Sequence, residues 1–327
     1  MSLLTVENVT HGFGARQILE NASFRLLKGE HIGLIGANGE GKSTFLNIIT
    51  GKLMPDEGNI TWSRHVTVGY LDQHSVLKKG MTIREVLRTA FDNMYSLEQE
   101  MLKLYEDMAL PENAEEAGEI QQMLEASGFY QLDSKIEEVA GGLGLSDIGL
   151  DKDVSDLSGG HRTKVLLVKL LLESPSILIL DEPTNYLDHP HIVWLTRFLS
   201  EYENAFILVS HDTEFLNSVV NVIYNLEGGN LTRYTGDYEN FMRMYEIKKE
   251  QELKAYERQQ AEIERLEDFI ARNKARVATR GMAHSRQKQL DKMEILEKPQ
   301  NKIKPEFNFL MARTPSRFIV EAKDLVI

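Results

Sequence analysis

A glycine-rich segment near the N-terminus combines the residue types that bind the phosphates of a nucleotide. It reads Gly36-x-x-x-x-Gly41-Lys42-Ser43, after an apolar run at 32–35 and before a stretch with helical spacing. Glycines let backbone N–H groups approach phosphates closely, and the start of a helix adds a positive potential. In this context Lys42 is expected to reach the β- and γ-phosphates, and the Ser43 hydroxyl to bind Mg²⁺. The alternative, a glycine-rich turn that only starts a helix, leaves the lysine and the hydroxyl unexplained.

Two carboxylates follow a second apolar run, at 177–180. Asp181 and Glu182 would stand at the C-terminal end of a buried strand, which is where open parallel sheets bind their ligands. Asp181 suits the Mg²⁺ shell, and Glu182 suits polarising the water that attacks the γ-phosphate. The alternative is an ordinary capping carboxylate before Pro183.

A third motif, Leu157-Ser-Gly-Gly160, precedes an apolar helical stretch at 165–172. A serine and two glycines at a helix N-terminus form a second anion-binding end, here without a lysine. If the motif stood alone, an ordinary N-cap by Ser158 would be the better interpretation.

Three single residues carry weaker signals. Gln73 and His211 each follow a predicted strand, and Phe13 lies between two glycines near the N-terminus. A histidine after a strand is commonly a structural hydrogen-bonding residue. Phe13 suits stacking on a purine or packing in a core.

The composition narrows the class of protein. The chain has 327 residues, no cysteine and a formal net charge of −13. This length allows one or two domains with a sizeable core, and without cysteine there is neither a disulfide nor a zinc–thiolate site. The sequence has no run of about 18 apolar residues and no signal-peptide pattern, so we expect a cytoplasmic protein without a membrane domain. The negative charge argues against nucleic-acid binding by the whole surface.

The apolar pattern predicts an α/β fold. Runs at 177–180 and 205–209 lack alternation, as strands of a parallel sheet covered on both faces do. A helix is expected between them, at about 189–202. Further strands are predicted at 3–9, 22–26, 60–62 and 66–71, and a helical region from about 82 to 145.

Charged residues are distributed unevenly along the chain. Residues 92–127 carry ten acidic side chains and one basic one, and Pro111 is expected to divide them into a helical hairpin with an acidic, solvated face. Residues 243–304 carry 16 Lys and Arg against 11 Asp and Glu, in a long helical pattern of coiled-coil type that is interrupted at 273–285. The residues that we expect to bind RNA gather near this interruption: Arg272, Lys274, Arg276, Arg280, Arg286, Lys288 and Lys292. The alternative is a solvated spacer between two domains.

Taken in order, these motifs resemble the nucleotide-binding domain of ABC ATPases over roughly residues 3–235. The resemblance implies an ABC-type P-loop ATPase domain with an antiparallel β subdomain and a helical subdomain, and it implies ATP and Mg²⁺ as cofactors. It implies catalytic roles for Glu182, His211 and Gln73, and Mg²⁺ contacts from Ser43, Gln73 and Asp181. The implied nucleotide-binding residues are Phe13 (stacking on adenine), Gly36, Asn38, Gly39, Gly41, Lys42, Ser43, Thr44, Ser158, Gly159, Gly160 and Asp188. His161 departs from the Gln or Glu that usually follows these signature glycines.

Two further features resemble the ABC-F subfamily, whose members have two such domains in one chain and no membrane domain. They are the segment Glu-Pro-Thr-Asn-Tyr-Leu-Asp at 182–188 and the basic helical linker with Ser-Arg-Gln-Lys-Gln-Leu-Asp-Lys-Met at 285–293. The implied domains are an ATP-binding domain at 1–240, with its helical subdomain and acidic arm at about 82–172, a linker at 241–304 and a truncated second domain at 305–327. The last of these is expected because 319–326 repeats the pattern of 3–10.

The ABC-F resemblance also implies an activity and partners. It implies ATP hydrolysis, weak in this chain, and action on the ribosome as a translation factor or in ribosome protection, with the linker approaching tRNA and rRNA. The partner for the ATP site would be a second ABC domain or a head-to-tail copy of the chain. One alternative is the ATPase subunit of a membrane transporter, which has no need of a basic helical linker. Another is a non-hydrolysing structural module.

Overall fold

The computed structural model describes residues 2–71, 77, 79–106, 111–273 and 280–296. Contacts divide the chain into two units, Met1–Met244 and Tyr245–Ile327, which are taken in turn. The predicted Gln73, the repeat at 319–326 and the whole segment 305–327 lie outside the described residues.

A small antiparallel sheet opens the first unit. It consists of β1 (Ser2–Phe13), β2 (Arg16–Leu27) and β4 (Glu57–Trp62), in the order β2-β1-β4. Alternate side chains of β1, including Leu4 and Val6, are buried in the core that this sheet shares with the larger one. Strands were predicted in these places, but β1 and β2 are longer than expected because they pair almost to their connecting turn.

The larger sheet has six strands in the order β5-β6-β7-β3-β8-β9. Its members are β3 (His31–Ile35), β5 (Val68–Tyr70), β6 (Ile177–Asp181), β7 (Ala205–Val209), β8 (Val222–Glu227) and β9 (Asn230–Thr235). The pairs β5–β6, β6–β7, β7–β3 and β3–β8 are parallel, and β9 is antiparallel to β8. The central strands β6 and β7 are buried almost throughout, which explains their unbroken apolar sequences and confirms the predicted parallel sheet. Their carboxyl ends therefore meet at one edge.

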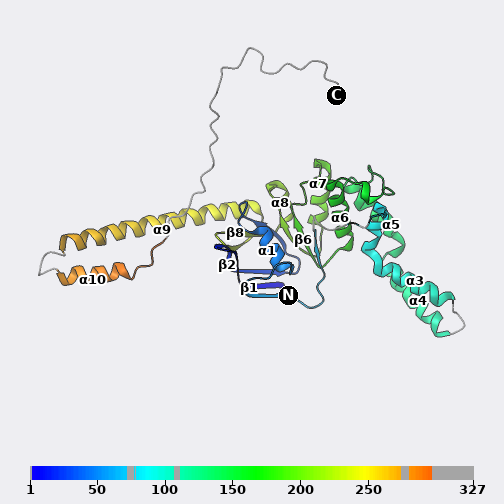
Figure 1. Ribbon diagram of the computed structural model, residues 1–327, viewed down its shortest axis with the longest axis horizontal. Helices are drawn as coiled ribbons and strands as arrows, with labels where there is room; N and C mark the ends of the chain where they lie inside the picture. The colour runs from blue at the N-terminus through cyan, green and yellow to red at the C-terminus, as the bar shows by residue number, and fades with distance from the viewer. Residues whose placement is uncertain (1, 72–76, 78, 107–110, 274–279, 297–327) are drawn as a thin grey trace, which may run out of the picture. The chain divides into compact units, whose positions relative to one another are not determined.

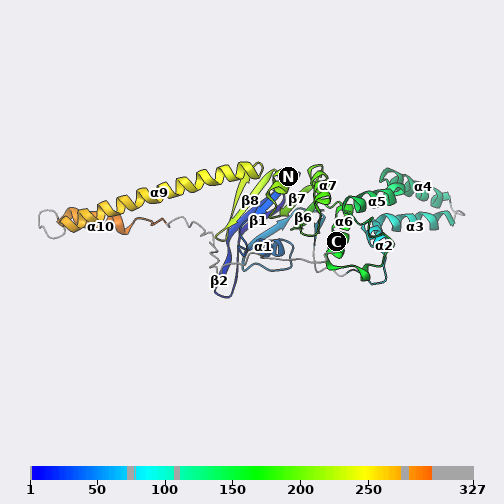
Figure 2. The ribbon, with the colours of Figure 1, turned by 90° about the horizontal axis from the view of Figure 1, so that it is seen from above.

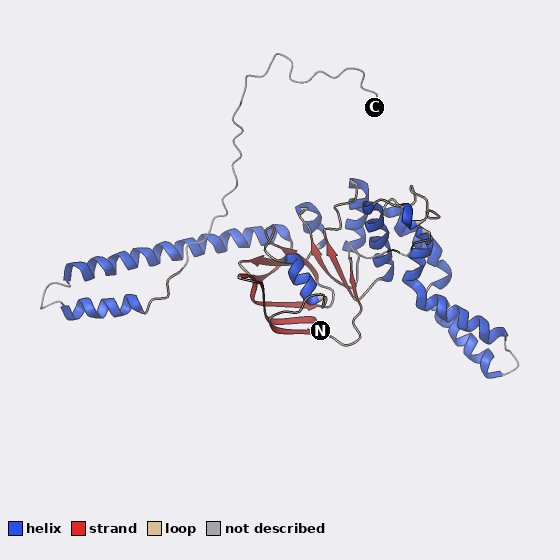
Figure 3. Ribbon diagram, in the orientation of Figure 1, coloured by secondary structure: helices blue, strands red, loops and turns tan. Residues whose placement is uncertain are grey.

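Helices account for the rest of the first unit. The α-helices are α1 (Lys42–Ile49), α2 (Ile83–Arg88), α3 (Asp92–Glu106), α4 (Pro111–Ala126), α5 (Leu132–Gly142), α6 (Gly159–Glu173), α7 (His189–Ser200) and α8 (Thr213–Val219). Short 3₁₀ turns lie at Thr89–Phe91, Phe129–Gln131 and Val154–Asp156. Figure 3 shows the strands gathered in one part of the unit and α2–α6 in another. Figures 1 and 2 show α3 and α4 as a pair, so the predicted hairpin is present, and α4 begins at Pro111.

The second unit contains most of α9 (Tyr238–Asn273) and all of α10 (Arg280–Asp291). Both views show α10 beside the C-terminal part of α9 (Figures 1 and 2). The Gln259 side chain of α9 binds the segment that follows α10. Its Nε2 donates to the Glu294 carbonyl at 2.7 Å, and its Oε1 accepts from the Leu296 N–H at 2.8 Å. The helix resumes at Arg280 rather than at 286 as expected. Gly281 weakens the local helical pattern, whereas Ala283 of the same helix is buried in the structure.

Candidate nucleotide-binding site

The phosphate loop connects the end of β3 to the start of α1. Gly41 occupies the N-cap of α1 with φ 105°, and no side chain caps the helix, so its first N–H groups remain available to a ligand. The Lys42 ammonium donates to the carbonyls of Gly36, at 2.8 Å, and Ala37, at 3.2 Å. The lysine is thus folded back across the loop.

Two of the loop glycines lie so close to neighbouring strands that a side chain would not fit at their positions. A Cβ added to Gly36 would lie 2.5 Å from the Leu226 carbonyl oxygen, and one added to Gly41 would overlap the Ile18 side chain. Both residues also have positive φ angles that favour glycine. The spacing of the motif therefore reflects contacts with β2 and β8 as well as room for phosphates.

The two predicted carboxylates lie where β6 ends. The Ser43 hydroxyl of α1 donates to Asp181 Oδ2 at 3.2 Å. Burial raises the pKa of the Asp181 carboxyl, and the Ser43 hydrogen bond and the Lys42 charge oppose that rise. A partly buried carboxylate beside a hydroxyl is a suitable place for a cation.

Glu182 faces His211, which follows β7. Their side chains approach to 3.5 Å between His211 Nε2 and Glu182 Oε1, and the His211 backbone N–H donates to Glu182 Oε2 at 3.4 Å. Burial raises the pKa of the Glu182 carboxyl, and the nearby His211 opposes this shift. Glu182 also has φ 49°, uncommon for a residue with a side chain. Glu182 Oε1 is itself buried, and among the described residues no group donates a hydrogen bond to it.

A cavity of about 340 Å³ joins these elements. It is lined by Ile18, Asn38, Gly39, Gly41, Lys42, Ser43, Thr44, Asp181, Glu182, Val209 and His211. Nine of these residues were predicted from the sequence; Ile18 and Val209 were not. Both are apolar strand residues, and an apolar residue within a strand gives no sign of facing a cavity.

These residues fit ATP with Mg²⁺. The helix N-terminus and Lys42 suit phosphates, and Mg²⁺ is usually held by one or two carboxylates together with substrate phosphates. Ser43 and Asp181 supply one hydroxyl and one carboxylate for that purpose. In the described part of the chain no cluster of three His, Cys, Asp or Glu residues forms a protein-only metal site. The geometry thus fits a cation that arrives with phosphates.

The signature residues lie elsewhere. Ser158 is the N-cap of α6, where its Oγ accepts from the His161 N–H at 3.4 Å. Asp188 is the N-cap of α7. Neither these two residues nor Gly159 and Gly160 line the phosphate-loop cavity. This separation shows that the loop and the signature of one chain do not share this cavity.

Phe13 ends β1 and is 55% exposed. It pairs with Arg16 across the β1–β2 turn, and the Arg16 guanidinium donates to the Gly39 carbonyl at 3.2 Å. The turn that carries Phe13 is thereby attached to the phosphate loop. Arg16 was not predicted, because the register of the hairpin is needed to find this contact.

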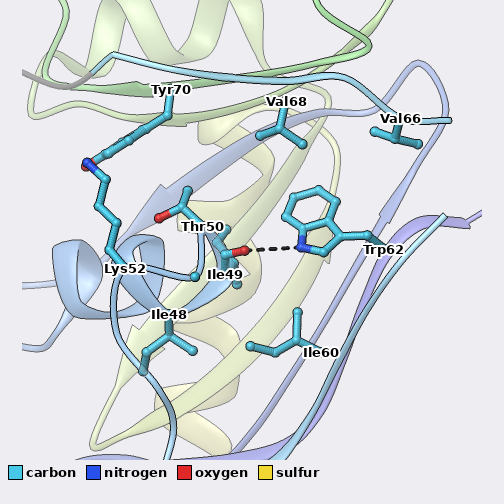
Figure 4. Close-up of a pocket in the computed structure, with 10 residues that line it drawn as sticks. Ile48, Ile49, Thr50, Lys52, Ile60, Trp62, Val66, Val68 and Tyr70 are labelled. Carbon is cyan, nitrogen blue, oxygen red and sulfur yellow. Dashed lines mark hydrogen bonds between the residues drawn. The ribbon is translucent and has the colours of Figure 1, made fainter. Parts of the chain in front are cut away.

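A second hollow of about 570 Å³ lies between the end of α1 and strands β4 and β5 (Figure 4). Its lining is mostly apolar and includes Ile49, Ile60 and Val68. The Trp62 indole N–H donates to the Ile49 carbonyl at 3.2 Å, and the Lys52 ammonium lies over the Tyr70 ring. None of the predicted site residues lines this hollow.

The predicted RNA-binding residues are only partly described. Arg272 pairs with Asp268 at 2.9 Å, and Arg286 donates to Gln289 at 2.8 Å. Lys288 is exposed on α10, and Lys292 follows that helix. Lys274 and Arg276 lie outside the described residues, as does the side chain of Arg280.

Comparison with known proteins places this geometry in a family. A profile described as ABC transporter matches residues 19–185, and a second with the same description matches 224–309. The chain belongs to the ABC transporter ATP-binding family. The first profile spans the phosphate loop, the signature and both carboxylates, so this ABC domain binds ATP through a P-loop.

Curated relatives agree with this assignment. The uncharacterized ABC transporter ATP-binding protein YfmM of Bacillus subtilis is 62% identical over 333 residues, which cover 100% of this chain and 64% of that protein. ABC transporter F family member 2 of Arabidopsis thaliana is 31% identical and is matched over 98% of this chain and 48% of its own length. The chain spans about half the length of the curated relatives that it matches.

Solved structures confirm the fold. An ATP-binding subunit of an ABC transporter has a TM-score of 0.55 and 23% identity, with 74% of this chain and 93% of that one covered. An Atm1-family bacterial exporter with ATP bound has a TM-score of 0.53 and 21% identity, with 74% and 40% covered. Among the described residues, no helix of this ABC protein is both long and apolar enough to span a bilayer.

Proposed function

We propose that this ABC protein is an ATPase of the ABC-F type that acts on the ribosome, with the linker at 241–304 approaching tRNA and rRNA. The family assignment supports ATP binding. Two relatives from Arabidopsis thaliana carry the name ABC transporter F family member, at 31% and 30% identity. In this proposal the chain contributes an ATP-binding domain at 1–240, and 305–327 begins a second one.

The proposed roles at the ATP site follow from the chemistry of each side chain. Lys42 and the glycine-loop N–H groups would bind phosphates, and Ser43, Asp181 and Gln73 would hold Mg²⁺, which would neutralise phosphate charge. Glu182 orients or deprotonates the attacking water, and His211 holds Glu182 in place.

The basic hairpin is the observation that carries the ribosomal part of the proposal. Residues 271–292 contain seven Lys and Arg and one acidic residue, Asp291, although the whole chain has a net charge of −13. Such a segment neutralises RNA phosphates and releases counterions, while the acidic remainder is repelled by RNA. The hairpin formed by α9 and α10 would present this charge at its bend.

An ATPase subunit of a membrane transporter is the second candidate. The name of YfmM, an ABC transporter ATP-binding protein, favours it. A transporter subunit has no use for a basic helical hairpin and would not bind ribosomes. The two candidates therefore predict different outcomes in one experiment.

The experiment is co-sedimentation of the ATP-trapped protein with ribosomes over a range of salt concentrations. Replacing Arg276, Arg280 and Arg286 together by Glu is expected to leave ATP binding intact, to abolish ribosome association and to flatten the salt dependence of any remaining binding. The matched control replaces Lys248, Lys254 and Arg258 of α9 by Glu, which changes the net charge of the linker by the same amount but away from the bend. Unchanged ribosome binding by the bend variant would show that the linker is only a spacer.

A further inference from the structure

His11 is a buried histidine that the proposed chemistry leaves unused. It lies on β1, two residues before Phe13, and its side chain is 6% exposed. Neither ring nitrogen makes a hydrogen bond among the described residues. Buried polar atoms without such partners are uncommon and call for a reason. An aliphatic residue would fill a core position at lower cost.

The imidazole contacts the ring proposed to stack on adenine. The rings of His11 and Phe13 are 4.9 Å apart between centroids at an interplanar angle of 89°, an edge-to-face arrangement. Alternate residues of a strand share a face, which places the two rings together. His11 is buried whereas Phe13 is 55% exposed. The histidine therefore supports one side of Phe13 and leaves much of the phenyl ring open.

Asp56 fixes the position of this pair. Its Oδ2 accepts from the Gly12 N–H at 2.9 Å and lies 3.4 Å from His11 Nδ1, and its own N–H donates to the Thr10 carbonyl at 3.0 Å. The backbone on both sides of His11 is thus held by one residue. A Cβ on Gly12 would lie 2.9 Å from the Arg16 carbonyl oxygen, so this position of the strand favours glycine.

We infer that His11 is a positioning residue for adenine recognition: its imidazole, held beside Asp56, fixes the orientation of the Phe13 ring that receives the base. This inference rests on the proposed stacking role of Phe13. It adds a residue that touches no nucleotide and acts only through Phe13. The phosphate contacts of Lys42 and the glycine loop do not depend on it.

The test separates base binding from phosphate binding. Calorimetric titrations with ATP and with inorganic tripolyphosphate, each with Mg²⁺, are made on the full chain. His11→Leu fills the buried space without a ring, and His11→Gln replaces it if the leucine variant does not fold. Either variant is expected to weaken ATP binding about 2- to 10-fold, the range of one aromatic pair, and to leave tripolyphosphate binding unchanged. His11→Phe restores an edge-to-face partner and is expected to restore ATP affinity.

Two further variants exclude a general structural effect. Val9→Ala removes buried packing from the same strand without touching Phe13, and is expected to change neither affinity. In a Phe13→Ala background the effect of His11→Leu is expected to disappear. Equal weakening of both ligands by His11→Leu, or an unchanged effect without Phe13, would overturn the inference. Phe13→Ala with wild-type ATP affinity would instead refute the stacking role itself.

Discussion

Glu182 combines partial burial, a backbone φ of 49° that is uncommon for a residue with a side chain, and a contact with His211 at 3.5 Å. If it orients or deprotonates the water, Glu182→Gln keeps the shape but loses the base. We expect ATP affinity to be retained and hydrolysis to fall by about 10²-fold or more. Steady-state phosphate release and equilibrium ATP binding measure the two effects separately.

Glu203→Gln is the matched control for this substitution, because Glu203 is exposed and lies before β7. It is expected to leave both ATP binding and turnover unchanged. Lys42→Ala, in contrast, should weaken ATP binding itself. Wild-type turnover in the Glu182→Gln protein would remove Glu182 from the mechanism.

Asp181 and Glu182 also make a prediction about stability and pH. Burial raises the pKa of both carboxyls in the folded, nucleotide-free protein. The folded state then holds their protons more tightly than the unfolded state. The free energy of unfolding therefore falls as the pH rises from about 4, the ordinary pKa of a carboxyl, through the raised pKa values of the folded state. Asp181→Asn is therefore expected to raise the melting temperature at pH 8.

Thermal unfolding without nucleotide or Mg²⁺, followed from pH 5 to pH 8, measures this effect. The difference between Asp181→Asn and wild type is expected to shrink toward acid pH, where the wild-type carboxyl is also neutral. A difference that stays constant with pH would show that the substitution acts through packing.

At the scale of residues, the groups with recognisable chemistry could be identified from the sequence, but the side chains that surround them could not. Lys42, Ser43, Asp181 and Glu182 could be placed in one site because strand ends converge at a sheet edge. Arg16 and Ile18 could not, since their contacts with the phosphate loop depend on the register of β1 and β2. A side chain that acts through shape leaves no pattern in the sequence.

Helix α5 ends in two adjacent glycines with opposite environments. A Cβ at Gly141 would meet only Ser146 Oγ, at 3.4 Å, whereas one at Gly142 would overlap the Trp194 indole of α7. Gly141→Ala is expected to stabilise the protein by about 0.4–1 kcal/mol, because alanine restricts the unfolded chain. Gly142→Ala is expected to destabilise it by about 1–3 kcal/mol through overpacking.

Urea unfolding of the two single variants measures both changes, and each variant is the control for the other. Each variant adds one methyl group, and the two positions are adjacent in the chain. Equal effects at both positions would show that α5 does not pack against Trp194 as described.

At the scale of elements, prediction succeeded where one physical signal dominates. The unbroken apolar runs that became β6 and β7 and the hairpin of α3 and α4 were all expected. The start of α10 was misplaced by six residues, because Gly281 weakens the local helical pattern although burial of Ala283 supports the helix. Local propensity could not reveal that tertiary contact.

The whole molecule raises the question of which surface completes the ATP site. Ser158 and its glycines lie away from the phosphate-loop cavity of the same chain. In the proposed arrangement they act on ATP bound to a partner domain. Dilute protein is then expected to bind ATP with weak hydrolysis, and turnover per chain is expected to rise with protein concentration if copies pair head-to-tail.

Mixing two inactive variants tests this arrangement directly. Lys42→Ala lacks a working phosphate loop, and Ser158→Ala lacks the signature hydroxyl. In a mixed head-to-tail pair one site has both defects and the other has neither. An equal mixture is therefore expected to recover about a quarter of wild-type turnover, since half of the pairs are mixed and each has one complete site. If each chain instead completed its own site, the mixture would be as inactive as its components at every concentration.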